Sequence, residues 1–181
     1  KADPADRQLT AAQKYGVLFQ DEFIEREGRR VVEVLKGGDL LKHVEPNDFV
    51  ISMRSFQGGI ESSRYRGSIS SAYVVLVPSD KIDVEFFTFL FKSEPYIQAL
   101  QSTSNLVRDG QALRYSNFTL VDLPLLPIEE QRRIALVLRG EADRTDSLVE
   151  KSHKLIHLLQ ERRSTRISAA VTGKIDVRNH L

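Results

Sequence analysis

The spacing of hydrophobic residues along the chain changes near residue 127. Before that point, short runs of β-branched and aromatic residues, such as FVISM at 49–53 and AYVVLV at 72–77, are separated by Gly, Pro, Asn and Asp residues typical of turns. Beyond it, apolar or small residues recur every three or four positions over roughly forty residues, which is the period of an α-helix. The pattern predicts strands joined by loops, followed by one long helix.

The first region also predicts two short helices and a last strand. The helices are expected at about 84–92 and 95–102, with Pro95 in the first turn of the second, where proline is well tolerated. Thr119 to Leu123 has the composition of a strand, closed off by Pro124 and Pro127. The expected fold class is therefore α/β (α+β): a mixed-sheet globular domain over residues 1–126 and a helical region over 127–181.

The long helix has its own start and stop signals. Glu129 and Glu130 follow Pro127 at the positive end of the helix dipole, and Gly173 is suited to a left-handed cap. Such a helix is about 60 Å long, which exceeds the width of a domain of about 120 residues, so its apolar stripe needs a partner helix. Gly140 marks either a kink or a break into two helices. The expected coiled-coil interface consists of Ile134, Leu138, Leu148, Leu155 and Leu159.

Composition narrows the possible functions. The 181 residues include no cysteine, which excludes disulfides, thiolate metal sites and a cysteine nucleophile. No apolar run is long enough to cross a bilayer, so we expect a cytoplasmic protein without membrane contact. The net charge of +1 combines −2 over residues 1–126 with +3 over residues 127–181. Charge alone gives little general attraction for nucleic acids.

No catalytic motif is present. The chain lacks a phosphate-binding glycine loop and a dinucleotide fingerprint. Asp83 and Glu85 resemble part of a metal-dependent nuclease centre, but the lysine that such a centre uses is missing. His153 and His157 lie four residues apart, yet no third ligand accompanies them. We therefore expect no cofactor, no metal and no enzymatic activity.

Two loops carry side chains suited to DNA contacts. Arginine pairs with guanine, glutamine pairs with adenine, and hydroxyl groups hold phosphates. By composition alone, the same loops are also typical of an ordinary polar surface. The candidate DNA-binding residues are Arg54, Ser55, Gln57, Arg64, Tyr65 and Arg66 in the first loop, and Arg108, Gln111 and Arg114 in the second.

Three segments together are similar to a known family. They are VEPNDFVISMRSFQGGIESSRYRGSISSAYVVLVP at 44–78, LPLLPIEEQRRIALVL at 123–138 and LLQERRSTRISAAVTGKIDVR at 158–178. In this order they resemble the specificity subunit of type I restriction-modification enzymes. The resemblance covers nearly all of the chain from about Val44 to Arg178, whereas residues 1–43 carry less of it.

The resemblance implies a target-recognition domain that reads one half of a split double-stranded DNA site, followed by a spacer helix. In the family, a complete subunit carries this pair twice, its two helices pack antiparallel, and catalysis belongs to the modification and restriction subunits that it recruits. One copy is present here, so we expect either a C-terminal fragment or a half-size subunit that pairs with a second copy. A coiled-coil assembly module without its own DNA target is the alternative.

Overall fold

The computed structural model describes residues 3, 5–12, 14–28, 41–52, 60–103 and 115–175. They fall in two compact units, Lys1–Ala135 and Leu136–Leu181, so the division comes slightly later than residue 126. The described elements are, in chain order, β1 (Gln8–Ala12), β2 (Gly16–Phe19), α1 (Gln20–Glu27), β3 (Leu41–Val44), β4 (Phe49–Ser52), β5 (Glu61–Ser62), β6 (Gly67–Ser70), β7 (Tyr73–Leu76), α2 (Val84–Lys92), α3 (Glu94–Ser102), α4 (Tyr115–Phe118) and α5 (Ile128–Val171).

The strands form two small sheets in the first unit. One has the order β2-β1-β6-β3, and the other has the order β5-β4-β7. Strands β1 and β6 run parallel, whereas the other pairs are antiparallel. Mixed sheets and separate helices make an α+β fold, which confirms the expected class. The apolar runs at 49–53 and 72–77 correspond to the neighbouring strands β4 and β7.

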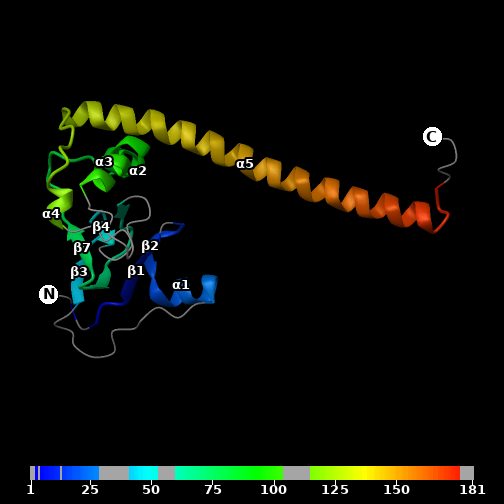
Figure 1. The fold of residues 1–181 in the computed structure, drawn as a ribbon, viewed down its shortest axis with the longest axis horizontal. Helices are drawn as coiled ribbons and strands as arrows, with labels where there is room; N and C mark the ends of the chain where they lie inside the picture. Colours follow the sequence, from blue (N-terminus) through cyan, green and yellow to red (C-terminus); the bar gives the residue numbers. More distant parts are fainter. Residues whose placement is uncertain are drawn as a thin grey trace. The chain divides into compact units, whose positions relative to one another are not determined.

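The three-stranded sheet has a hydrophobic core on each face, because successive side chains of a strand point to opposite sides. Phe49 and Ile51 of β4 pack in one cluster with the apolar residues of α2 and α3. Val50, between them, packs in a second cluster with Leu9 and Ile69 of the four-stranded sheet. The first unit is therefore layered as helices, small sheet and larger sheet, with α2 and α3 on the outer side of β4 (Figure 1).

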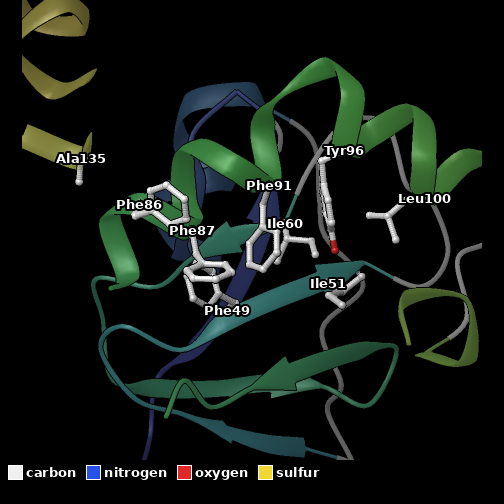
Figure 2. Packing of buried hydrophobic residues seen from close by; sticks show 9 residues of the cluster. All are labelled: Phe49, Ile51, Ile60, Phe86, Phe87, Phe91, Tyr96, Leu100 and Ala135. Atoms are coloured by element: carbon white, nitrogen blue, oxygen red, sulfur yellow. The ribbon is translucent and has the colours of Figure 1, made fainter. Parts of the chain in front are cut away.

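The cluster under α2 and α3 is largely aromatic. Figure 2 shows Phe87 and Phe91 of α2 pointing towards Phe49 on β4, with Tyr96 of α3 beside them. The rings of Phe49 and Phe91 meet edge to face with centroids 5.0 Å apart, a favoured geometry for aromatic pairs. Both short helices were predicted, and their observed bounds, Val84–Lys92 and Glu94–Ser102, confirm them.

The strand expected at 119–123 is wrong. Tyr115–Phe118 forms one helical turn, α4, and the chain continues in turns. The N–H groups of Thr119, Leu120 and Val121 donate to carbonyls three or four residues earlier, so they are not available to a sheet. Val121 and Leu123 pack against the aromatic cluster. Their apolar character therefore reflects burial on the core and not strand pairing.

Helix α5 is continuous through Gly140, so of the two alternatives for this glycine, a kink or a break into two helices, the break is absent. Its 44 residues correspond to a length of about 66 Å. It ends at Val171, and Gly173 follows with a φ of 71°, which is the left-handed cap conformation that was expected. Among the helices that the structure describes, none has both the length and the apolar character needed to cross a bilayer.

Candidate nucleic-acid interface

The described part of the candidate surface is the loop that joins β5 to β6, residues 63–66, called here the β5–β6 loop. It carries Arg64, Tyr65 and Arg66. The other six candidate residues, namely Arg54, Ser55, Gln57, Arg108, Gln111 and Arg114, lie outside the described residues, so their predicted role stays a prediction.

Hydrogen bonds to the turn before β4 and within the loop itself hold the backbone of the β5–β6 loop. The Ser63 N–H donates to the Asp48 carbonyl at 2.7 Å, and the Ser63 carbonyl accepts from the Asn47 N–H at 2.7 Å. The Ser63 hydroxyl donates to the Tyr65 carbonyl at 2.8 Å and accepts from the Tyr65 N–H at 3.2 Å. Ser63 is buried. These bonds fix the loop, which lowers the ordering cost of binding a ligand.

Arg64 is exposed at the tip of this loop. No ion pair joins it to any residue in the described part of the chain. A guanidinium that pairs with no carboxylate of the described residues, on a fixed backbone, is suited to bidentate contacts with a phosphate or with the guanine edge, because its donors form a rigid fork.

Tyr65 packs on a second aromatic side chain that sequence reasoning missed. Its ring lies 4.8 Å from the ring of Phe19, at the end of β2. The guanidinium of Arg7 lies over the Phe19 ring, 3.7 Å from its centroid, and also pairs with Asp21 at 2.6 Å. The hydrogen bond from Arg7 lowers the pKa of the Asp21 carboxyl group. Phe19 therefore extends the aromatic surface around Tyr65, and Arg7 lies on the Phe19 ring as half of an ion pair with Asp21.

Gly67 explains how Arg7 comes so close to the loop. A Cβ on residue 67 would lie 2.6 Å from the Arg7 carbonyl oxygen and 2.8 Å from the Leu9 side chain. The adjacent Ser68 N–H donates to the same Arg7 carbonyl at 3.0 Å. Glycine is therefore needed for the backbone approach of the segment before β1 to the start of β6.

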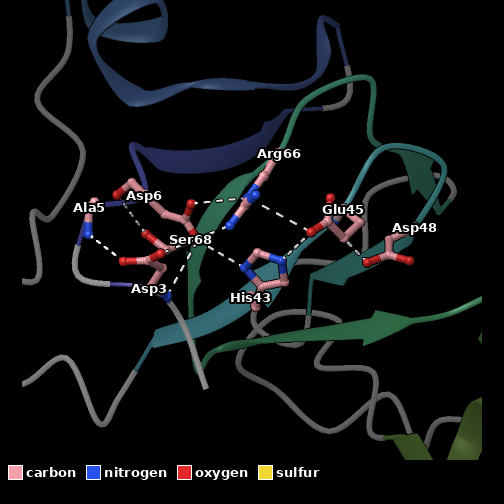
Figure 3. A network of polar contacts seen from close by, with 8 residues as sticks. All are labelled: Asp3, Ala5, Asp6, His43, Glu45, Asp48, Arg66 and Ser68. Atoms are coloured by element: carbon pink, nitrogen blue, oxygen red, sulfur yellow. Dashed lines mark hydrogen bonds and ion pairs between the residues drawn. The ribbon is translucent and has the colours of Figure 1, made fainter.

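Arg66 differs from Arg64, because it lies within a cluster of carboxylates. Its Nε atom is 3.4 Å from Asp6 and 3.8 Å from Glu45, and a terminal nitrogen is 3.9 Å from Asp3. His43 of β3 contacts two of the same acids (Figure 3). No role was predicted for His43 or Asp6 from the sequence, because the residues of this cluster are up to 63 positions apart in the chain.

The coiled-coil residues predicted on α5 fall in two environments. Ile134 packs against the aromatic cluster of the first unit, next to buried Ala135. Leu138, Leu148, Leu155 and Leu159 are exposed, with 39%, 59%, 57% and 53% of their surface accessible. The exposed stripe therefore begins at Leu138, and it is apolar surface of the kind that a partner helix covers.

Two of the residues considered for metal chemistry, Asp83 and His157, have other partners. Asp83 caps α2, since its side chain accepts from the Phe86 N–H at 2.9 Å. His157 lies 3.8 Å from Glu161 on the same helix. Within the residues that the structure describes, no group of three or more potential ligands is placed to hold a metal ion.

Comparison with known proteins adds no identification. No protein-family model matches the chain, and no curated protein matches it.

Proposed function

We propose that the chain recognises one part of a double-stranded DNA target and is a specificity subunit, or half of one, of a type I restriction-modification system. The observation that carries this proposal is exposed Arg64, which has no ion pair among the described residues and stands on a loop whose backbone is fixed by Ser63. Tyr65, next to it in the chain, adds aromatic surface together with Phe19, while Arg7 and Arg66 are paired with carboxylates. Phosphate contacts would position the loop, and contacts to base edges would give sequence preference.

The long helix supports pairing with a second copy. Residues 128–150 of α5 carry four basic and six acidic side chains, whereas residues 151–171 carry five basic and one acidic. An antiparallel pair therefore places a half of charge −2 beside a half of charge +4, while a parallel pair places like charges together. Charge on the flanks of a coiled coil sets the orientation of the partner, so this asymmetry favours the antiparallel arrangement.

In this function the chain is not a catalyst. It selects the site and recruits a modification subunit, which methylates DNA, and through it a restriction subunit. Access to DNA places the assembly in the cytoplasm. The helix length of about 66 Å is close to two turns of DNA, at about 34–36 Å each, so a fixed helix pair suits a target in two separated parts.

The DNA contact is tested by replacing Arg64. We expect Arg64→Ala to weaken binding of the full chain to its target duplex by about 1–3 kcal/mol, if the guanidinium contacts a base. Lys81→Ala is the matched control, because Lys81 is exposed in the same unit and its loss changes the net charge equally. Equal affinities for the wild type and Arg64→Ala in titrations of labelled duplex would remove Arg64 from the interface.

The complete function is tested by reconstitution with a modification subunit, followed by mapping of methylated sites on genomic DNA. A two-part methylated motif is expected, and a palindromic motif is expected if two identical copies pair. Methylation without any sequence preference contradicts the proposal.

The exposed stripe on α5 also favours a second candidate function, an assembly module whose globular unit has no DNA target. Binding to non-specific duplex at low and high salt separates the two. A salt-dependent affinity, alone or with the modification subunit, favours DNA recognition, because phosphate contacts release counterions. The absence of such binding in both mixtures favours the assembly module.

A further inference from the structure

His43 and Arg66 contact the same two carboxylates. His43 Nδ1 lies 2.8 Å from Asp6 Oδ2, and His43 Nε2 lies 2.6 Å from Glu45 Oε1. Arg66 Nε lies 3.4 Å from Asp6 Oδ1 and 3.8 Å from Glu45 Oε1. The four side chains come from three places in the chain: the segment before β1, the end of β3 and the residue before β6 (Figure 3).

The contacts of His43 require a charged ring. A neutral imidazole has one N–H donor and one lone pair, but here both nitrogens face carboxylate oxygens at hydrogen-bond distance. Only the imidazolium form donates to both. The hydrogen bond to Glu45, followed by that to Asp6, raises the pKa of His43 despite the opposing effect of burial. Burial also opposes ionisation of Asp6, but the His43 hydrogen bond, the Asp3 N–H and Arg66 together lower the pKa of Asp6.

We propose that His43 is a positioning residue for Arg66: the charge on its ring sets how strongly Asp6 and Glu45 hold the guanidinium. With His43 charged, two cations share the carboxylates of Asp6 and Glu45, and Arg66 is more easily drawn to another anion. With His43 neutral, Arg66 is the cation that the described residues leave among Asp3, Asp6 and Glu45, and these carboxylates hold it back. The consequence for DNA, that a phosphate or base edge competes for Arg66 more successfully at low pH, rests on the proposed function.

The coupling itself is tested without DNA, by NMR titration of the histidines in the full chain. His43→Gln identifies the His43 signal by its loss. Arg66→Gln is expected to shift the His43 titration to higher pH, because a repelling charge that shares both carboxylates is removed. Asp6→Asn is expected to shift it to lower pH. An unchanged His43 titration in Arg66→Gln overturns the proposal.

The consequence for DNA is tested by measuring affinity for a duplex between about pH 6 and pH 8, the range in which histidine changes charge. The wild type is expected to lose about fivefold in affinity as the pH rises, within the usual range of coupling between sites. His43→Gln is expected to show little of this loss. His153→Gln, which changes an exposed histidine of α5, is expected to retain it.

The outcomes separate the two proposals. No DNA binding at any pH removes the proposed function, while the NMR titration still decides whether His43 and Arg66 are coupled. DNA binding with the same pH dependence in wild type and His43→Gln overturns the role of His43 and leaves DNA recognition standing.

Discussion

Single side chains hold together parts of this chain that are distant in sequence, and Gln131 is the clearest case. It is fully buried near the start of α5. Its amide nitrogen donates to the carbonyls of Lys81, at 2.9 Å, and Leu126, at 2.7 Å, while its oxygen accepts from the Asp83 N–H at 2.8 Å. The Gln131 side chain thus joins the start of α5 to the residues just before α2 and to the residues just before α5 itself.

We predict that Gln131→Ala destabilises the first unit by about 2–4 kcal/mol, because three partly buried backbone groups lose their partner and a cavity remains where the fully buried side chain was. Urea denaturation followed by circular dichroism measures the change. Gln98→Ala is the matched control, since Gln98 is exposed on α3 and bonds to Glu94 one turn away. Its effect should stay within about 0.5 kcal/mol, and a similar loss in both variants contradicts the role given to Gln131.

His43 makes stability depend on pH in a defined direction. Its pKa in the folded chain is raised above the ordinary value of 6.5 by Glu45 and Asp6. The charged ring therefore stabilises the fold fully below pH 6.5, and this contribution is lost as the pH rises through the raised folded pKa. We expect the urea midpoint of the wild type to fall over this interval more than that of His43→Gln. Parallel curves for the two proteins rule out the effect.

At the scale of elements, the glycine within α5 can be replaced by a residue with a side chain, whereas the glycine that caps the helix cannot be replaced without strain. A Cβ added to Gly140 or to Gly173 would meet no neighbouring group of the described residues within 4 Å, but Gly173 has a φ of 71° and Gly140 is helical. We predict that Gly140→Ala stabilises the helix by up to about 1 kcal/mol and that Gly173→Ala weakens its end by about 1 kcal/mol. Thermal unfolding followed by far-ultraviolet circular dichroism distinguishes them, and a loss of stability in Gly140→Ala contradicts this account.

Elements with a strong local signal were predictable. The α5 helix has a sustained period, a proline and acidic start and a glycine end, and the two short helices and the strands β4 and β7 are apolar runs bounded by turn residues. The strand expected at 119–123 failed because Val121 and Leu123 are apolar for packing on the core, and a short apolar run does not distinguish this from sheet pairing.

The candidate site was predictable only in part, for the same physical reason. Arg64, Tyr65 and Arg66 are contiguous, so their composition marks the β5–β6 loop. Their neighbours Arg7 and His43 reach the loop through sheet pairing over long sequence distances. No local pattern encodes those contacts.

At the scale of the whole molecule, the exposed stripe of α5 predicts self-association. Leu155 and Leu159 lie one turn apart and are both more than half exposed. We predict that a Leu155→Glu, Leu159→Glu double variant loses the dimer. Each leucine removed from a helix interface costs roughly 2 kcal/mol of association free energy, and the two costs together raise the dimer Kd by well over tenfold. Sedimentation velocity at several concentrations measures this.

Leu136→Glu is the control for that experiment. Leu136 is also exposed on α5, but it precedes Leu138 by two residues and so lies about 200° around the helix, on the opposite side. It should leave the dimer intact. A monomeric wild type at high concentration contradicts self-pairing altogether.

The parallel pairing of β1 with β6 finally bears on the order in which the chain folds. It joins Gln8 to Ser68 and Leu9 to Ile69, and closing a loop of about 60 residues costs on the order of 4 kcal/mol of chain entropy. Helix α5 needs only contacts four residues apart, and helices of this kind form within about a microsecond. During synthesis the β5–β6 loop can bond to Asn47 and Asp48 as soon as it has left the ribosome, but it meets the segment before β1 only when β6 pairs with β1. A nascent chain that stops before β6 contains Arg7, Phe19 and Tyr65 but lacks the strand pairing that brings the segment before β1 to the loop.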